Sequence, residues 1–140
     1  MSDAVLAIDV DGLGLALSVD VIEEILDPPA HRPLPHAPAH LTGLACVRGA
    51  PLPLVDLGLL VDQAASAPDA ERVVIVDVSG ARAGLFVSRV RGVVSGATRR
   101  PPGVPMSPRL RALAVEQIEA PTGILLELDA RALLEAARAR

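Results

Sequence analysis

The sequence predicts one mostly β domain of the barrel or sandwich type, with two short helices. Three observations support this prediction: about nine short apolar segments, turn-forming residues regularly spaced between them, and a length of 140 residues that suits one domain. The residues are 51% hydrophobic and almost entirely aliphatic, with Phe86 as the single aromatic side chain. The chain therefore has enough apolar material for a core but lacks aromatic platforms for nucleotides.

The chain begins with a predicted antiparallel hairpin. Ala4–Val10 and Leu13–Val19 alternate in side-chain character, and Asp11-Gly12 between them is a dipeptide favoured in two-residue hairpin turns. We expect this hairpin to be half-buried, with the larger side chains of the second strand on one face.

The periodicity changes after Ser18. Apolar residues at Val21, Ile22, Ile25 and Leu26 predict one or two turns of helix, with Glu23 and Glu24 on its outer side. Pro28-Pro29 ends this helix and opens a proline-rich loop of extended backbone.

The stretch Leu41–Leu57 carries two short apolar runs, Leu44–Val47 and Leu52–Val55. Their alternation and the Gly/Pro residues between them predict two strands joined by a tight turn that contains Arg48. A guanidinium group cannot be buried cheaply without a partner, so Arg48 is expected to point outward or to be paired.

The second half of the chain continues the β pattern. The predicted strands are Arg72–Val78, Ala83–Arg89, Val90–Ser95, Arg111–Glu119 and Gly123–Leu128. Val61–Ala70 is expected to be a surface loop and Gly96–Arg109 an irregular segment. Asp129–Arg140 predicts a short C-terminal helix, with Asp129 as its N-cap.

Charge and hydropathy exclude several function classes. The net charge of −4 and the scattered arginines argue against a nucleic-acid-binding surface. The chain has no lysine, which excludes Schiff-base chemistry. No apolar run approaches the length of a membrane span, and the N-terminal residues do not resemble a signal peptide. The sequence is therefore expected to be a soluble, cytoplasmic protein.

Candidate catalytic and metal-binding residues are few. Cys46 lies between two apolar residues, which favours a small buried side chain over a nucleophile. His31, His36 and His40 could converge on a metal ion, but no carboxylate or cysteine accompanies them, and solvated loop histidines are the favoured interpretation. Asp56 follows a strand, where a lone carboxylate usually caps a turn. We expect no catalytic site, no metal site and no cofactor.

An ordered series of segments resembles the CheW family of chemotaxis coupling proteins over nearly the whole chain. They are Leu15–Leu26, Pro33-Leu34-Pro35 with Ala37-Pro38, Gly43–Gly49 running into Leu52–Leu57, Arg72–Val78, Gly84–Val87 with Val90, Pro101-Pro102, and Ile124–Leu128. The resemblance implies one CheW-like domain over residues 1–140, built from two small five-stranded SH3-like β-barrels packed over a shared core, with short helices including the C-terminal one.

The resemblance also implies a non-catalytic adaptor with two kinds of partner. One surface would bind the cytoplasmic tip of a methyl-accepting chemoreceptor, and another would bind the regulatory domain of the histidine kinase CheA. No nucleic acid and no direct membrane insertion is implied, so the expected location is the cytoplasm, at membrane-bound receptor arrays.

The family's Asn-x-Arg-Gly turn falls on Cys46-Val47-Arg48-Gly49. The resemblance therefore assigns receptor binding to Val47, Arg48 and Gly49, together with Ile22 and Glu24, and implies an ion pair between Glu24 and Arg48. Arg100 and Val104 match positions at which neighbouring adaptor and kinase domains meet.

The sequence departs from the family pattern in three places: Cys46 replaces the motif's asparagine, Ser88 a common aspartate, and Leu15 a common aromatic residue. Two alternatives to the coupling adaptor remain open. One is a regulatory decoy that binds kinase or receptor without coupling them, in a related non-flagellar pathway. The other is a catalytic β-barrel protein that uses Cys46 or the histidines.

Overall fold

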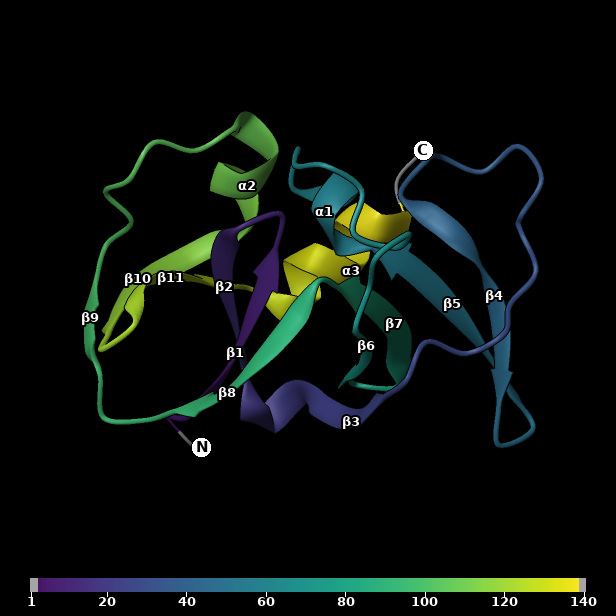
Figure 1. The fold of residues 1–140 in the computed structure, drawn as a ribbon, viewed down its shortest axis with the longest axis horizontal. Coiled ribbons are helices and arrows are strands. Elements are labelled where there is room, and N and C mark those ends of the chain that lie inside the picture. The colour runs from purple at the N-terminus through teal and green to yellow at the C-terminus, as the bar shows by residue number, and fades with distance from the viewer. Residues whose placement is uncertain (1–2, 139–140) are drawn as a thin grey trace.

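The computed structural model describes residues 3–138, which form two β-sheets and three α-helices (Figure 1). The strands are β1 (Val5–Val10), β2 (Leu13–Ser18), β3 (Ile22–Leu26), β4 (Leu41–Val47), β5 (Ala50–Asp56), β6 (Arg72–Val78), β7 (Ala81–Val87), β8 (Arg89–Val94), β9 (Thr98–Arg100), β10 (Ala114–Ala120) and β11 (Gly123–Leu128). The helices are α1 (Leu57–Leu60), α2 (Pro108–Leu113) and α3 (Ala130–Arg138), with a 3₁₀ turn at Val19–Val21. The predicted mostly β fold is confirmed.

One sheet has six strands in the order β8-β1-β2-β11-β10-β9, and the other has five in the order β3-β6-β7-β5-β4. The six-stranded sheet is curled, because its two edge strands β8 and β9 are joined by only the three residues 95–97. The family resemblance implies five strands in each barrel, and this sheet has a sixth, the edge strand β9. It lies within Gly96–Arg109, which the sequence had predicted to be irregular, and its residues pair with β10.

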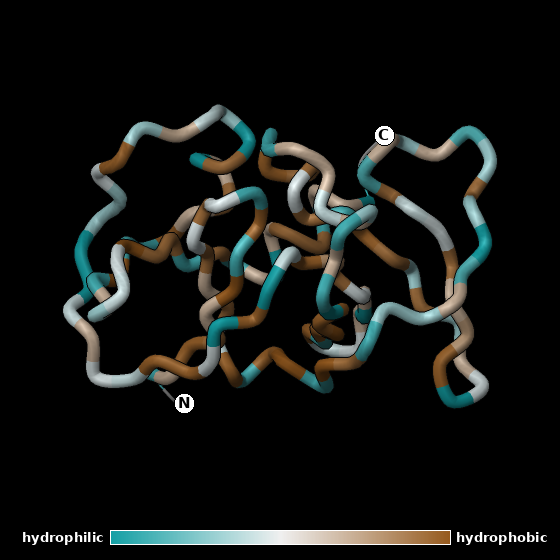
Figure 2. Tube along the Cα trace, in the orientation of Figure 1, coloured by the Kyte–Doolittle hydropathy of each residue, from teal (hydrophilic) through white to brown (hydrophobic). Residues whose placement is uncertain are grey.

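The largest apolar cluster, which we call the shared cluster, lies between the two sheets. It combines side chains from β1 and β2 with others from β5, β6 and β7, and α3 closes it with Leu133, Leu134 and Ala137. Each sheet also has one smaller apolar cluster on its other side. Figure 2 shows the corresponding hydrophobic residues along the central strands and more hydrophilic residues in the outer loops.

Strand β1 is buried on both faces, so the prediction of a half-buried first hairpin is wrong for this strand. Leu6, Ile8 and Val10 face the shared cluster, while Val5 and Ala7 face the smaller cluster of the six-stranded sheet. The sequence conceals this because Ala7 is small enough to pass for a residue on a solvated face.

The predicted helix over Val21–Leu26 is also wrong, because these residues form the end of the 3₁₀ turn and strand β3. A β-bulge between Ile22 and Glu24 explains the misleading spacing. The extra residue places Ile22 opposite Val76 and Ile25 opposite Val74, and both valines belong to the shared cluster. Two apolar residues three apart thus share one face of a strand, which mimics a helical pattern.

Three hairpins turn on two residues that both have positive φ: Asp11-Gly12, Arg48-Gly49 and Ser79-Gly80. This is the geometry of a type I′ turn, whose twist matches that of the flanking strands. The turn positions predicted from the sequence are confirmed. Two strands begin earlier than predicted: β5 at Ala50 instead of Leu52, and β7 at Ala81 instead of Ala83.

The helices differ in part from the prediction. Residues 111–113 belong to α2, which Ser107 caps by accepting a hydrogen bond from the Leu110 amide, and the strand predicted from Arg111 starts at Ala114. The N-cap role of Asp129 is confirmed, since its Oδ1 accepts from the amides of Arg131 and Ala132. The last two residues of the predicted C-terminal helix lie outside the described residues.

Candidate functional site

Arg48 occupies the first position of the β4–β5 turn, with φ of 50°, and Gly49 follows with φ of 79°. The left-handed conformation costs a residue with a Cβ about 1–2 kcal/mol, and glycine meets no such cost. The turn therefore carries a long cationic side chain at a place where the fold alone favours Asn, Asp or Gly. The Arg48 side chain is 62% exposed, as expected for an outward-pointing guanidinium.

Arg48 is paired with Glu24, as the family resemblance implies. Its Nη1 donates to Glu24 Oε1 at 2.7 Å, and its Nη2 also contacts this oxygen. Glu24 lies on β3, and Arg48 lies on the turn that follows β4. Strands β3 and β4 are the two edge strands of the five-stranded sheet. The ion pair thus joins opposite edges of a strongly curled sheet and stays in contact with water.

The remaining residues assigned to this surface are Ile22, Val47 and Gly49. Ile22 and Val47 are partly buried, because each packs against an apolar cluster. Gly49 is exposed, with open space where a side chain would start. We call these three residues, together with Glu24 and Arg48, the Arg48 surface. The structure brings Glu24 and Arg48 into direct contact; the binding role of all five stays a prediction.

The sequence reasoning missed a second ion pair next to the first. Arg82, from the start of β7, donates to both oxygens of Glu23, from Nε at 2.9 Å and from Nη2 at 2.6 Å. This hydrogen bonding lowers the pKa of the Glu23 carboxyl below its ordinary value and raises the pKa of the Arg82 guanidinium. A third pair joins Asp27 to Arg72 at 3.2 Å, beyond the end of β3.

Apolar side chains flank these pairs. Ile25 on β3 is 39% exposed and Leu44 on β4 is 38% exposed. Leu44 and Arg82 also line an open groove of about 470 Å³ that reaches α3. Its main apolar lining is Leu34, Leu41, Leu44, Pro53, Val55 and Leu134. An apolar groove beside oriented surface charges is suited to binding a protein segment.

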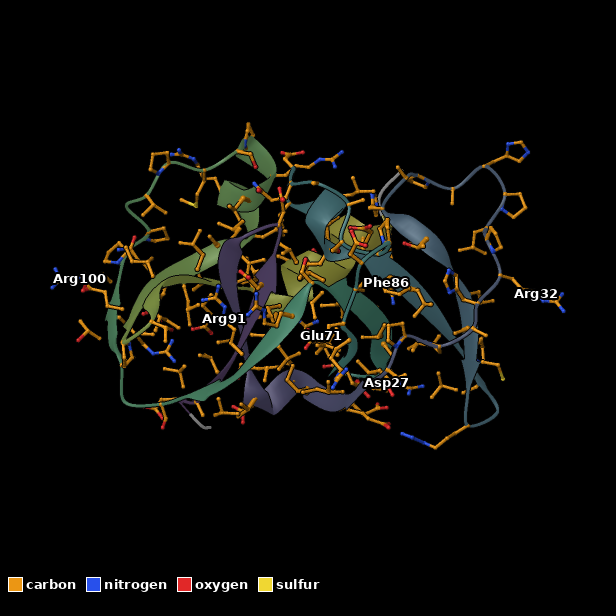
Figure 3. The ribbon with its side chains drawn as sticks, viewed as in Figure 1. Asp27, Arg32, Glu71, Phe86, Arg91 and Arg100 are labelled. Carbon is orange, nitrogen blue, oxygen red and sulfur yellow. The ribbon has the colours of Figure 1, made fainter. Side chains whose placement is uncertain are left out.

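Arg100 lies at the other end of the molecule (Figure 3). Arg100 is exposed on β9, with its Nε in contact with Glu119 Oε1 (Figure 3). Val104 is partly buried and packs against the shared cluster, so it presents less apolar surface than the sequence prediction assumed. Strand β9 and the β4–β5 turn are separated along the long axis (Figure 1).

Cys46 is exposed, so its prediction as a buried side chain is wrong. The strand register turns Ala45 inward and Cys46 outward. His40 is not a solvated loop residue either, because it is 7% exposed and its Nε2 donates to the Ala137 carbonyl at 3.0 Å. Among residues 3–138, no group of His, Cys, Asp or Glu side chains is arranged to hold a metal ion.

Asp56 caps α1 and is almost completely buried. Its Oδ1 accepts from the Leu59 amide at 3.0 Å and from the amide and hydroxyl of Ser66, both at 2.8 Å. Its Oδ2 accepts from the Ala67 amide at 2.9 Å. Three donors from Ser66 and Ala67 anchor the loop after α1 to this carboxylate, and the Leu59 amide is the capped donor of α1, which confirms the predicted turn-capping role.

Three comparisons relate the chain to known proteins. A family model described as a CheW-like domain matches residues 4–138. A relative named chemotaxis protein CheW, from Rhizobium meliloti strain 1021, is 37% identical over 68 residues, which cover 48% of this chain and 44% of that protein. The crystal structure of the scaffolding protein TtCheW from Thermoanaerobacter tengcongensis aligns with a TM-score of 0.77 at 18% identity, over 92% of this chain and 90% of that one.

The alignment with the Rhizobium relative thus spans less than half of that relative's length. The likeness to the solved structure shows a shared fold. Within residues 3–138, no helix is long and apolar enough to cross a membrane.

Proposed function

This chain belongs to the family of CheW-like domains, and from this premise we propose that it is a non-catalytic adaptor. It couples the cytoplasmic tips of methyl-accepting chemoreceptors to the regulatory domain of the histidine kinase CheA. It works in the cytoplasm, at membrane-bound receptor arrays, as one domain with no cofactor.

The observation that carries this proposal is the exposed Arg48–Glu24 pair. Next to Glu24 in the sequence, Glu23 binds Arg82, and Arg82 lines an apolar groove. A receptor tip is a helical coiled coil, and an amphipathic helix needs an apolar groove for its buried side and oriented charges for its polar side. Exposed ion pairs contribute only about 0–1 kcal/mol to folding. The left-handed backbone of Arg48 is a cost that the exposed pair does not offset in folding, and this favours a role for Arg48 in partner recognition.

A coupling role needs two surfaces that can be occupied at once. The Arg48 surface belongs to the five-stranded sheet, whereas Arg100 belongs to an edge strand of the six-stranded sheet. We assign kinase binding to Arg100 and Val104. Because β9 and the β4–β5 turn lie far apart along the long axis, a receptor tip at Arg48 and a kinase domain at Arg100 would not compete for space (Figure 1).

The test replaces Arg48 by glutamate and measures binding of a purified receptor cytoplasmic fragment. Arg48→Glu places two carboxylates side by side, so we expect receptor affinity to fall by about tenfold or more, with little change in the thermal midpoint. The matched control is Arg111→Glu, which makes the same charge change at an exposed arginine of α2. Unchanged receptor binding by Arg48→Glu would overturn the assignment of the Arg48 surface.

A kinase assay separates the adaptor from a decoy. Kinase binding is measured first, with Arg100→Glu expected to weaken it, and receptor control of kinase activity is then measured with and without the adaptor. An adaptor makes kinase activity depend on the receptor. If the protein binds both partners but kinase activity is the same with and without the receptor, the protein is a decoy instead.

A further inference from the structure

Strand β8 is an end strand of the six-stranded sheet, and its only strand partner is β1. Among residues 3–138, no residue of β8 makes a backbone hydrogen bond outside that pairing. The outer edge of β8 therefore carries backbone donors and acceptors that are not used within the described part of the chain.

A cleft of about 830 Å³ opens beside this edge. It lies between β8 and the β10–β11 turn, with Ala7 of β1 also in its lining. We call it the β8 cleft; its lining includes Ala7, Arg89, Arg91, Gly92, Ser95 and Thr122.

The β8 cleft is cationic although the whole chain carries a net charge of −4. Arg89 is exposed, and its guanidinium makes no hydrogen bond or ion pair with any residue between 3 and 138. Arg91, also on β8, binds Asp9 Oδ2 at 3.1 Å, and Figure 3 labels it to the left of the centre of the molecule. No carboxylate lines the cleft, and Asp9, the partner of Arg91, is only 5% exposed.

We propose that β8 binds an extended, acidic segment of a partner protein as an added strand. The added strand would use the free backbone edge of β8, and its alternate side chains would enter the cleft. Arg89 favours a carboxylate at one of those positions, and Ser95 and Thr122 offer hydroxyls to others. The charge selects the partner, because an edge strand that carries arginines repels another copy of itself.

This interaction is separate from the proposed receptor and kinase contacts at Arg48 and Arg100. Its test therefore needs neither partner. The probe is a fluorescein-labelled octapeptide of alternating glutamate and threonine, with blocked ends, and binding to the full chain is followed by fluorescence anisotropy. A second probe has the same sequence but carries N-methyl groups on all its backbone amides, which removes the backbone donors of both strand edges without changing the charge.

We expect the unmodified peptide to bind and Arg89→Glu to weaken this binding by about tenfold. The control variant Arg111→Glu should bind the peptide as the unmodified protein does, because it makes the same charge change away from the cleft. The N-methylated peptide should bind far more weakly, and hydrogen exchange should slow within residues 89–94 when the unmodified peptide is present.

Three outcomes would overturn the proposal. The first is no binding of the unmodified peptide at concentrations up to about 1 mM, the weak end of specific association. The second is equal binding of the N-methylated peptide, which would indicate charge attraction without strand pairing. The third is equal loss of binding in Arg89→Glu and Arg111→Glu, which would place the effect in the net charge of the protein.

Discussion

Asp56 and Glu24 are both carboxylates of the five-stranded sheet, but their surroundings are opposite. Asp56 ends β5 inside the protein, where it accepts hydrogen bonds from three amides and a hydroxyl. Glu24 lies on the edge strand β3, is 35% exposed in its side chain, and binds one arginine whose side chain is 62% exposed.

This difference separates the residues that hold the fold from those available to a partner. The donors around Asp56 are backbone amides of the loop after α1, so removing the carboxylate would leave buried N–H groups unpaired. Water can replace either member of the Glu24–Arg48 pair at little cost. The same chemistry is therefore structural at Asp56 and free for recognition at Glu24.

The largest effect expected from this comparison is on the stability of Asp56→Ala. Loss of an acceptor for four buried or partly buried donors should lower the free energy of unfolding by about 3 kcal/mol, since a hydrogen bond to a charged group contributes about 1.5–3 kcal/mol and unpaired donors add to the loss. Urea denaturation followed by circular dichroism measures the change.

Asp129→Ala is the matched control for Asp56→Ala. Asp129 also caps a helix, through two amides, but it is exposed, so its loss should cost only about 1 kcal/mol. If Asp56→Ala cost no more than Asp129→Ala, the contrast between buried and exposed carboxylates would not hold.

The sequence was sufficient for most of the strands and for the Arg48 turn. Positive-φ turns leave a strong local signal, because only a few residue types tolerate them, and Gly49 and Gly80 mark two of these turns directly. The Glu24–Arg48 pair was not visible in this way. Its two members are 24 residues apart and meet only because the sheet is curled, so it could be expected only from the family resemblance.

The errors have local causes. The bulge in β3 gives Ile22 and Ile25 a helical spacing, which explains the wrong helix. Glu23 is the residue of this bulge without a strand partner, and it binds Arg82, which is 59 residues away in the sequence. Cys46 was misjudged because burial in a strand depends on register, which one sequence does not specify when both neighbours are apolar.

A smaller effect is expected from the pH dependence of the Glu23–Arg82 pair. The pKa of Glu23 is lowered in the folded state, so the pair stabilises the fold at pH values above the unfolded-state pKa and loses this effect as pH falls through the folded-state pKa. The free energy of unfolding should therefore differ between wild type and Arg82→Gln at pH 7, and this difference should shrink at pH 3.

Arg111→Gln controls for the general effect of removing one positive charge at low pH, because Arg111 is an exposed arginine outside the ion pairs of β3. The measurement is urea denaturation of the three proteins at both pH values. A difference for Arg82→Gln that follows the Arg111→Gln difference at both pH values would mean that the pair contributes nothing specific to stability.

The smallest effect on stability, and the sharpest use of the comparison, comes from Arg48→Asn. Asparagine tolerates the left-handed conformation better than arginine, which offsets the loss of an exposed ion pair, so the free energy of unfolding should stay within about 0.5 kcal/mol of wild type. Receptor-fragment binding should nevertheless fall, because the side chain no longer reaches Glu24 or a partner. Measured together by urea denaturation and by direct binding, these two results distinguish a recognition residue from a structural one. A clear loss of stability in Arg48→Asn would instead mean that the ion pair between the two sheet edges holds the curled sheet together, as the donors around Asp56 hold the loop after α1.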